Sequence, residues 1–477
     1  MSSRLAAILR AAPLLIAGLY LVACFAALWR VAATIGLHVP FDPNEGWNAY
    51  HAAAAMSGQA LYPPVQSYFV NNYPPLSFYV VGLLGHAIGD MIVAGRLISL
   101  LAFLAVMAGI WHSTLIMGAG RLAAAIAALL FAAMLLIGSD YVGMDDPQML
   151  GHALEMGALL LVLRGRDWMA AFVFVAAIFV KHNLVAMPVA TAAWLLLHDR
   201  RRALRFIASG VGFLLLGLGA FRLIYGSSLI SHLASARVYS FGLLESSVGA
   251  WLIWATVPLA ISALLRACYG RDRFVQFVVI YAAIATIVGV GFSGGAGVDA
   301  NAFFDADIAL SLGVALALGR FAPRGALWPA CLALSLLLPL FLALVSDADW
   351  RDPDFWLHPM ADDAAQARGD IAFLAAHKGP ALCETLAYCY WAGKAAEIDV
   401  FNVGQQFATG ARRDAQFDCM LEGHAFAAIE FDSLDPFSLT PRLRTALLHA
   451  YRVDHVDDGG VFLVPLASRR RPAALRS

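Results

Sequence analysis

The sequence predicts a polytopic α-helical membrane protein that ends in a small α/β domain. Of the 477 residues, 61% are hydrophobic and 14% are charged, whereas a soluble protein carries about 25% charged residues. Apolar stretches of about 18 residues or more recur along the first three quarters of the chain, and each is long enough to cross a bilayer. Charged residues return after about residue 347, so the remainder is expected outside the membrane.

The apolar segments predict about eleven transmembrane helices within a membrane domain of residues 1–346. The first segment is long and lacks a small-residue cleavage site, so it is interpreted as a retained anchor rather than a signal peptide. The expected spans are 11–36, 93–116, 121–140, 148–164, 168–182, 184–198, 206–225, 249–267, 274–292, 306–320 and 326–346.

Positively charged residues lie almost entirely in alternate loops, which is typical of the cytoplasmic side of a membrane protein. The opposite loops hold only Lys181 and Arg237 clear of the span edges. The protein is therefore expected in the inner (plasma) membrane, with its N-terminus in the cytoplasm. An odd number of spans places the C-terminal part on the periplasmic side. The positively charged loops contain Arg4, Arg10, Arg121, Arg164, Arg166, Arg200, Arg201, Arg202, Arg205, Arg266, Arg271, Arg273, Arg320 and Arg324.

The first outer loop, residues 37–92, is long and rich in proline, tyrosine and asparagine. Its apolar parts are too short and too interrupted for a confident span, so 44–57 and 76–88 are predicted as helices that lie along the membrane surface. If 76–88 crossed the membrane, every later loop would change sides and the asymmetry of positive charge would be lost.

The C-terminal part, residues 347–477, is predicted as an α/β domain because helix-like and strand-like patterns alternate there. Cys383, Cys389 and Cys419 lie in this part and allow one disulfide, whose pairing the sequence leaves open. The basic end, 468–477, is interpreted as a solvated tail. Helices are expected near 361–378 and 437–450, strands at 381–385, 426–432 and 461–467, and a hairpin turn at 457–460.

Polar side chains gather in the loops of one membrane face. Ionisable groups at the edge of a helical bundle are costly unless they are paired or solvated, so their concentration on one side indicates a shared cavity. A carboxylate could accept a proton from an acceptor group, and a cation could balance a phosphate leaving group. The set comprises Asp42, Glu45, Asp145, Asp146, Lys181, Arg237, Tyr239, Asp299 and Asn301.

Four outer-loop motifs resemble, in order and spacing, those of the GT-C superfamily of membrane glycosyltransferases. This superfamily includes the protein O-mannosyltransferases and the lipid A aminoarabinose transferases. The likeness covers roughly residues 1–310. The motifs are DPNEGWNAYHAAAAMSGQALYP with the following NNYPPLSFYVVG and AGRLIS, then MDDPQML, FVKHN and GVDANAFFD.

The resemblance implies a polyprenyl-phosphate-linked sugar donor, inverting transfer to an acceptor on the periplasmic face, and no obligatory metal. It places the second-loop acid of the family on Asp146 and the donor-side lysine on Lys181. The usual base position is occupied by Asn44, so the base is expected to be Glu45 or Asp42. No Lys or Arg lies near these two acids in the sequence, which is expected to leave them basic.

Around the donor, the resemblance and the loop positions favour Lys181 together with Arg237, Tyr239, Asp145, Asp299, Asn301 and Tyr73. Tyr73 stands where the aminoarabinose transferases carry a lysine, so one phosphate contact is missing or supplied elsewhere. A divalent cation between Asp42, Glu45 and Asp146 is compatible with these residue types, but carboxylates alone do not establish one. The expected partners are the lipid-linked donor, a glycan, lipid or protein acceptor and membrane lipids, with no nucleic acid.

Structural interpretations compete with each of these roles. Asp42 could cap the helix that begins near Pro43, and Glu45 could be the acid of a capping box. His152 and Glu155, one turn apart in a span, are expected to hydrogen-bond between helices. Alternative functions are a transporter or flippase of lipid-linked sugars, or a catalytically inactive envelope scaffold; Asn44 at the usual base position keeps the scaffold alternative open.

Overall fold

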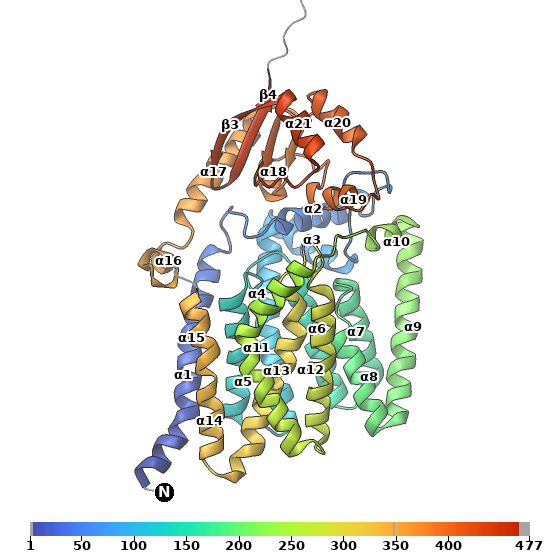
Figure 1. Ribbon diagram of the computed structural model, residues 1–477. Coiled ribbons are helices and arrows are strands. Elements are labelled where there is room, and N and C mark those ends of the chain that lie inside the picture. The colour runs from blue at the N-terminus through green and yellow to red at the C-terminus, as the bar shows by residue number, and fades with distance from the viewer. Residues whose placement is uncertain (1–2, 347–348, 467–477) are drawn as a thin grey trace, which may run out of the picture.

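The computed structural model describes residues 3–346 and 349–466. Long helices stand side by side in a bundle, and a C-terminal α/β domain covers one end of it (Figure 1). We refer to this end of the bundle as the capped end. The basic segment 468–477 lies outside the described residues.

Eight helical segments of the described chain are long and apolar enough to cross a membrane, which agrees with a polytopic membrane protein. Their length and apolar composition suit a membrane crossing, because a helix of about 20 residues spans the hydrocarbon layer. They are α1 (Ser3–Thr34), α4 (Met91–Ile116), α5 (Arg121–Gly138), α9 (Arg200–Tyr225), α11 (Phe241–Tyr269), α12 (Arg273–Phe292), η1 with α13 and η2 (Ala300–Phe303, Phe304–Phe321 and Ala322–Arg324), and α14 with α15 (Leu327–Ser335 and Leu337–Ser346).

Three further segments expected to span are shorter apolar helices, so the count of eleven stays a prediction. They are α6 (Gln148–Leu163), α7 (Asp167–Val180) and α8 (Ala186–His198), with 16, 14 and 13 residues. The positively charged connections between helices lie at the end of the bundle away from the capped end (Figure 1). There Arg202 pairs with Asp167 at 2.7 Å.

Two helices of the first loop, α2 (Asn44–Ser57) and α3 (Leu76–Ile88), lie at the capped end, and their bounds match the expected ranges. α2 is enclosed by protein: it packs on α3 and α4 on one side and on α18 (Leu386–Trp391) of the C-terminal domain on the other. Trp47 and Ala49 of α2 are buried in these contacts. The first loop therefore joins the bundle to the C-terminal domain.

Gly46 is the point of closest approach between α2 and α18. A Cβ atom added at Gly46 would lie 2.0 Å from the backbone nitrogen of Ala387. We expect Gly46→Ala to push the two helices apart and to cost about 1–3 kcal/mol, seen as a lower unfolding temperature in detergent and faster proteolytic release of the C-terminal domain. Gly36→Ala, whose added Cβ meets nothing within 4 Å, serves as the control. Equal behaviour of the two variants would contradict this account of the junction.

The C-terminal domain contains a four-stranded sheet in the order β1-β2-β4-β3. β1 runs parallel to β2, and the other neighbours are antiparallel. β3 was not expected from the sequence: it is an edge strand with mostly exposed side chains, so it lacks a buried alternating face. The elements are β1 (Ala381–Cys383), β2 (Ala428–Phe431), β3 (Tyr451–Asp457), β4 (Gly460–Pro465), η3 (Asp349–Arg351), α16 (Pro353–Leu357), α17 (Ala361–Ala376), α19 (Val400–Ala408), α20 (Ala415–Glu422) and α21 (Pro441–Ala450), with α10 (Ser228–Leu233) in the bundle.

Two local features of this domain settle details that the sequence left open. Cys383 and Cys389 form a disulfide, and Cys419 is an exposed free thiol. The helix expected at 437–450 begins only at Pro441, because the Thr440 hydroxyl caps it by accepting the Leu443 N–H at 3.3 Å.

Candidate functional site

A cavity of about 320 Å³ lies between the capped end of the bundle and the C-terminal domain. Five carboxylates line it, and no Lys or Arg belongs to its described lining. The first loop, the second loop, the glycine-rich loop before α13 and the C-terminal domain all contribute. We refer to it as the acidic cavity; it is lined by Asp42, Pro43, Asn44, Trp47, Tyr141, Gly297, Val298, Asp299, Glu384, Leu386, Asp399, Phe401, Asn402 and Asp432.

Two of the carboxylates come from the sheet. Glu384 directly follows β1 and Asp432 directly follows β2, and the carboxyl ends of parallel strands share one edge of a sheet, where ligands commonly bind. The backbone N–H of Asp432 donates to Glu384 Oε2 at 3.0 Å. Neither acid was predicted as a site residue. The predicted strands 381–385 and 426–432 included them, whereas the observed strands end one residue before each acid.

Asp399 is a third acid that sequence reasoning missed. It precedes α19 and accepts hydrogen bonds from the Asn402 backbone at 3.0 Å and from the Trp47 indole N–H at 3.0 Å. Burial raises the pKa of Asp399 to about 6, against the lowering effect of these donors. Its bond to Trp47 joins the C-terminal domain to α2 across the acidic cavity.

Asp42 is the predicted catalytic acid that reaches this cavity. Its carboxylate is half-buried and one oxygen accepts the Asn44 N–H at 2.7 Å, so the expected cap-like contact is present. Burial raises the pKa of Asp42 to about 6, and the negative charges of Asp146, Glu45 and Asp299 add to this effect. An acid with a pKa in this range can be ionised at neutral pH and still take up a proton.

Glu45 lies in a different environment, and the expectation that no cation lies near it is wrong. Its side chain is fully buried and forms two charge-assisted hydrogen bonds with Arg96 of α4, at 2.7 and 2.6 Å. The backbone N–H groups of Phe41 and Asp145 also donate to this carboxylate, at 2.9 and 3.0 Å. Both carboxylate oxygens are therefore engaged by protein donors, and Glu45 does not belong to the described lining of the acidic cavity.

Asp146 and Lys181 are brought together as the sequence predicted. Lys181 Nζ donates to both oxygens of Asp146, at 2.7 and 2.9 Å, and both residues are buried. The ring centre of Tyr73 lies 4.9 Å from Lys181 Nζ and 4.9 Å from the ring centre of Trp47, which lines the acidic cavity. Neither member of the ion pair belongs to the described lining of that cavity.

Glu45 and Asp146 are thus each engaged by a cation, Arg96 and Lys181. The three-carboxylate set Asp42, Glu45 and Asp146, which was compatible with a divalent ion in the sequence, does not present three unpaired carboxylates. The ion pairs already supply the balancing positive charge at two of the three positions.

The other predicted residues are divided between the cavity and its surroundings. Asp299 is exposed and lines the cavity, whereas Asn301 and Asp145 are buried. Arg237 stacks on Phe401, 4.9 Å from the ring centre, and donates to the Ala296 carbonyl at 3.2 Å.

Tyr239 belongs to the same loop as Arg237. It forms a backbone bridge with Gly295 and keeps 49% of its surface exposed. Arg237 and Tyr239 therefore hold the glycine-rich loop that carries Asp299. Of the two, only Arg237 contacts a side chain that lines the acidic cavity, Phe401.

A second cavity, of about 300 Å³, lies among α5, α11, α13 and α15. Its lining is mostly apolar and aromatic and includes Trp251, Trp254 and Phe303. Asp299 lines both cavities. The arrangement gives one acidic space under the C-terminal domain and one apolar space between helices, with a shared carboxylate.

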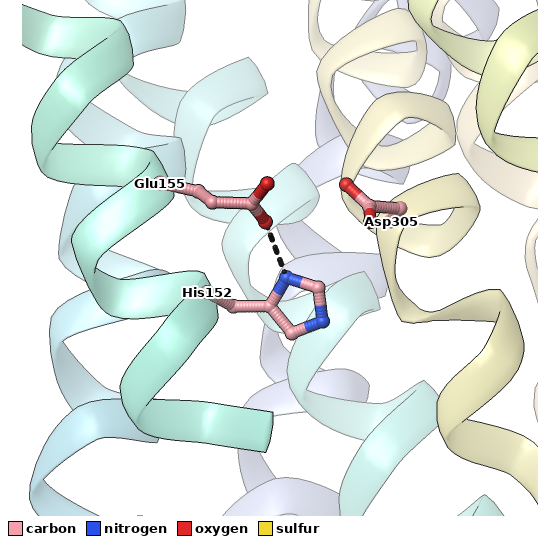
Figure 2. A group of neighbouring side chains, drawn as sticks. All are labelled: His152, Glu155 and Asp305. Carbon is pink, nitrogen blue, oxygen red and sulfur yellow. Dashed lines mark hydrogen bonds and ion pairs between the residues drawn. The ribbon is translucent and has the colours of Figure 1, made fainter. Parts of the chain in front are cut away.

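A cluster of three polar side chains lies inside the bundle (Figure 2). His152 and Glu155 of α6 face Asp305 of α13, and all three are buried. The expected interhelical bond of His152 is instead a bond within α6, from Nδ1 to Glu155 Oε2 at 2.9 Å.

Comparison with known proteins finds similar structures but no protein of similar sequence among the families and curated proteins that were compared. No protein-family model matches the chain, and no curated protein does. The crystal structure of ArnT from Cupriavidus metallidurans in the apo state superposes with a TM-score of 0.61 at 16% sequence identity, covering 95% of this chain and 98% of that one. The same enzyme bound to undecaprenyl phosphate gives 0.59 at 15% identity with the same coverage. The fold expected from the sequence, a helical membrane bundle followed by a small C-terminal α/β domain, is confirmed by this likeness.

Proposed function

We propose that this protein transfers a sugar from a polyprenyl-phosphate-linked donor to an acceptor in the acidic cavity. The observation that carries the proposal is the meeting of this cavity with the apolar cavity at Asp299. A lipid-linked sugar needs both environments, because its chain is apolar and its reacting carbon must meet a base. The ArnT structure with bound undecaprenyl phosphate, which shares the fold, supports a donor of this class.

In the proposed reaction, Asp42 is the general base. An acceptor oxygen or nitrogen attacks the anomeric carbon, the bond from that carbon to the phosphate oxygen breaks, and the acceptor proton passes to Asp42. The polyprenyl phosphate leaves with the bonding electron pair, and one displacement inverts the anomeric centre. Asp42 suits this role because it is half-buried, faces the cavity and has a raised pKa of about 6.

The leaving phosphate requires positive charge near the cavity. Arg237 is placed for it: a Cβ atom added at Gly297, a lining residue, would lie 3.1 Å from Arg237 Nη1. Burial lowers the pKa of Arg237, and charges that are partly buried are screened less by salt than exposed ones. Lys181 does not belong to the described lining of the cavity and donates to both oxygens of Asp146, so we assign it to the positioning of that acid.

We further propose that the capped end faces the periplasm and that the N-terminus is cytoplasmic. The support is the separation of charge along the bundle: the positively charged connections lie at the opposite end (Figure 1), as in membrane proteins whose cytoplasmic loops retain Lys and Arg. No nucleotide donor is available outside the cytoplasm, which favours a lipid-carried sugar.

The experiment is a comparison of envelope lipids and glycans, by mass spectrometry, from cells with and without the gene and from cells complemented with Asp42→Asn. We expect one pentose- or hexose-sized increment to be missing from an acceptor, and the polyprenyl-phosphate sugar to accumulate, in the deletion and in the Asp42→Asn strain. Identical profiles with and without the gene would refute the transferase. Restoration by Asp42→Asn would instead favour a flippase or a scaffold.

A further inference from the structure

The polar group of Figure 2 has the composition and spacing of a metal site. His152, Glu155 and Asp305 each offer one ligand atom, and these atoms all lie within 4.8 Å of one another. One imidazole with two carboxylates suits a divalent transition metal such as Zn²⁺ or Mn²⁺. Figure 2 shows the Glu155 carboxylate pointing from α6 toward Asp305 on α13, with the His152 ring beside it.

Charge inside this group is unbalanced. His152 and Glu155 have no exposed surface and Asp305 is 6% exposed. Glu155 Oε1 has no hydrogen-bond partner among the described residues, and no Lys or Arg of the described chain forms an ion pair with Glu155 or Asp305. Two carboxylates in a buried bundle are costly without a counter-charge, and one divalent cation between them would supply it.

Two neighbouring residues hold two of the three side chains, as the outer partners of metal ligands do. The Tyr281 hydroxyl donates to Asp305 Oδ1 at 2.5 Å, leaving the other carboxylate oxygen for a ligand. The Gln148 amide nitrogen lies 2.8 Å from His152 Nε2, and Gln148 Oε1 has no hydrogen-bond partner among the described residues. With that oxygen turned toward the ring, it accepts the Nε2 proton, and His152 Nδ1 presents its lone pair to the space shared with Glu155 and Asp305.

We propose that His152 Nδ1, Glu155 and Asp305 bind one Zn²⁺ or Mn²⁺ ion. Binding moves the imidazole proton from Nδ1 to Nε2 and replaces the present bond from His152 to Glu155 by two metal–ligand bonds. The ion also fixes the adjacent ion pair, because the backbone N–H of Gln148 donates to Asp146 Oδ1 at 2.7 Å. The role is structural, and it does not depend on the proposed sugar transfer.

The test is the metal content of the full-length protein purified in detergent, after dialysis against Zn²⁺ or Mn²⁺ and then against metal-free buffer. We expect about one ion per chain in the unmodified protein, and at least a tenfold loss in Glu155→Gln and in Asp305→Asn. Asp370→Asn is the matched control. It removes a carboxylate from the other described three-ligand group, Asp370, His455 and Asp457, and should leave the metal in place.

A chelator provides a second readout on the unmodified protein, which keeps the proposal testable if a variant fails to fold. We expect its unfolding temperature to fall by about 5 °C when the ion is removed, and that of Glu155→Gln to stay constant. Unmodified protein that retains no ion, or retained ion that Asp370→Asn abolishes and Glu155→Gln does not, would overturn the site. These measurements need no transfer assay, so their failure leaves the proposed function to be judged separately.

Discussion

Asp42→Asn is expected to lower the rate of sugar transfer by about 10²–10⁴-fold, the range that a positioned general base contributes. The asparagine amide cannot accept the acceptor proton, but its oxygen can keep the bond with the Asn44 N–H that Asp42 makes at 2.7 Å. The protein should therefore fold and bind the donor normally. Initial rates with purified protein, together with the unfolding temperature, separate the loss of rate from a loss of folding.

The pH dependence of the transfer rate identifies which carboxylate acts as the general base. With the pKa of Asp42 raised to about 6 by burial, the base is ionised above pH 6 and becomes protonated below it. The rate should be level above pH 7 and fall about tenfold per pH unit below pH 5. Asp432→Asn, a change in another lining residue of the same cavity, should keep this acid limb, whereas the residual activity of Asp42→Asn should lack it. An unchanged limb in Asp42→Asn would assign the base elsewhere.

Helices of the bundle were predictable from the sequence because apolar length and charge position determine them independently of their neighbours. α4 and α12 begin and end within two residues of the expected spans. α6, α7 and α8 were also predicted as spans, but an apolar helix of 13–16 residues is compatible with a crossing or with a helix buried in protein. Length does not decide between them; packing against neighbouring helices does.

The site was predictable only in part, because the order of the spans determines which loops meet but not how helices and domains pack against one another. Loops that leave the same end of a bundle must come close, so the meeting of Asp146 with Lys181 followed from the order of the spans. The contact of Glu45 with Arg96 joins a loop helix to the beginning of α4, and the sequence pattern gives no sign of it. Asp399 reaches the cavity through docking of a second domain, and that orientation is likewise invisible in the sequence.

Glu45→Gln is expected to destabilise the protein by about 3–5 kcal/mol, because it leaves the Arg96 guanidinium buried without a counter-charge. Arg96 has no exposed surface and also donates to the carbonyl groups of Leu37 and Val39, at 2.7 and 2.6 Å. This ion pair therefore fastens the start of the first loop to α4. Thermal unfolding in detergent should show the loss, and transfer activity should disappear only at temperatures where the variant unfolds.

The double replacement Glu45→Met with Arg96→Met separates the structural account from the catalytic one. Each single variant leaves one buried charge without its partner, whereas the double variant has no charge at either position and places apolar side chains in the buried space. The double variant should therefore be more stable than either single variant. It should also retain measurable transfer below its unfolding temperature, because Asp42 still faces the cavity. A folded Glu45→Gln variant with normal stability and no transfer would show the reverse: that Glu45 is the base, and that its ion pair with Arg96 opens when substrate binds.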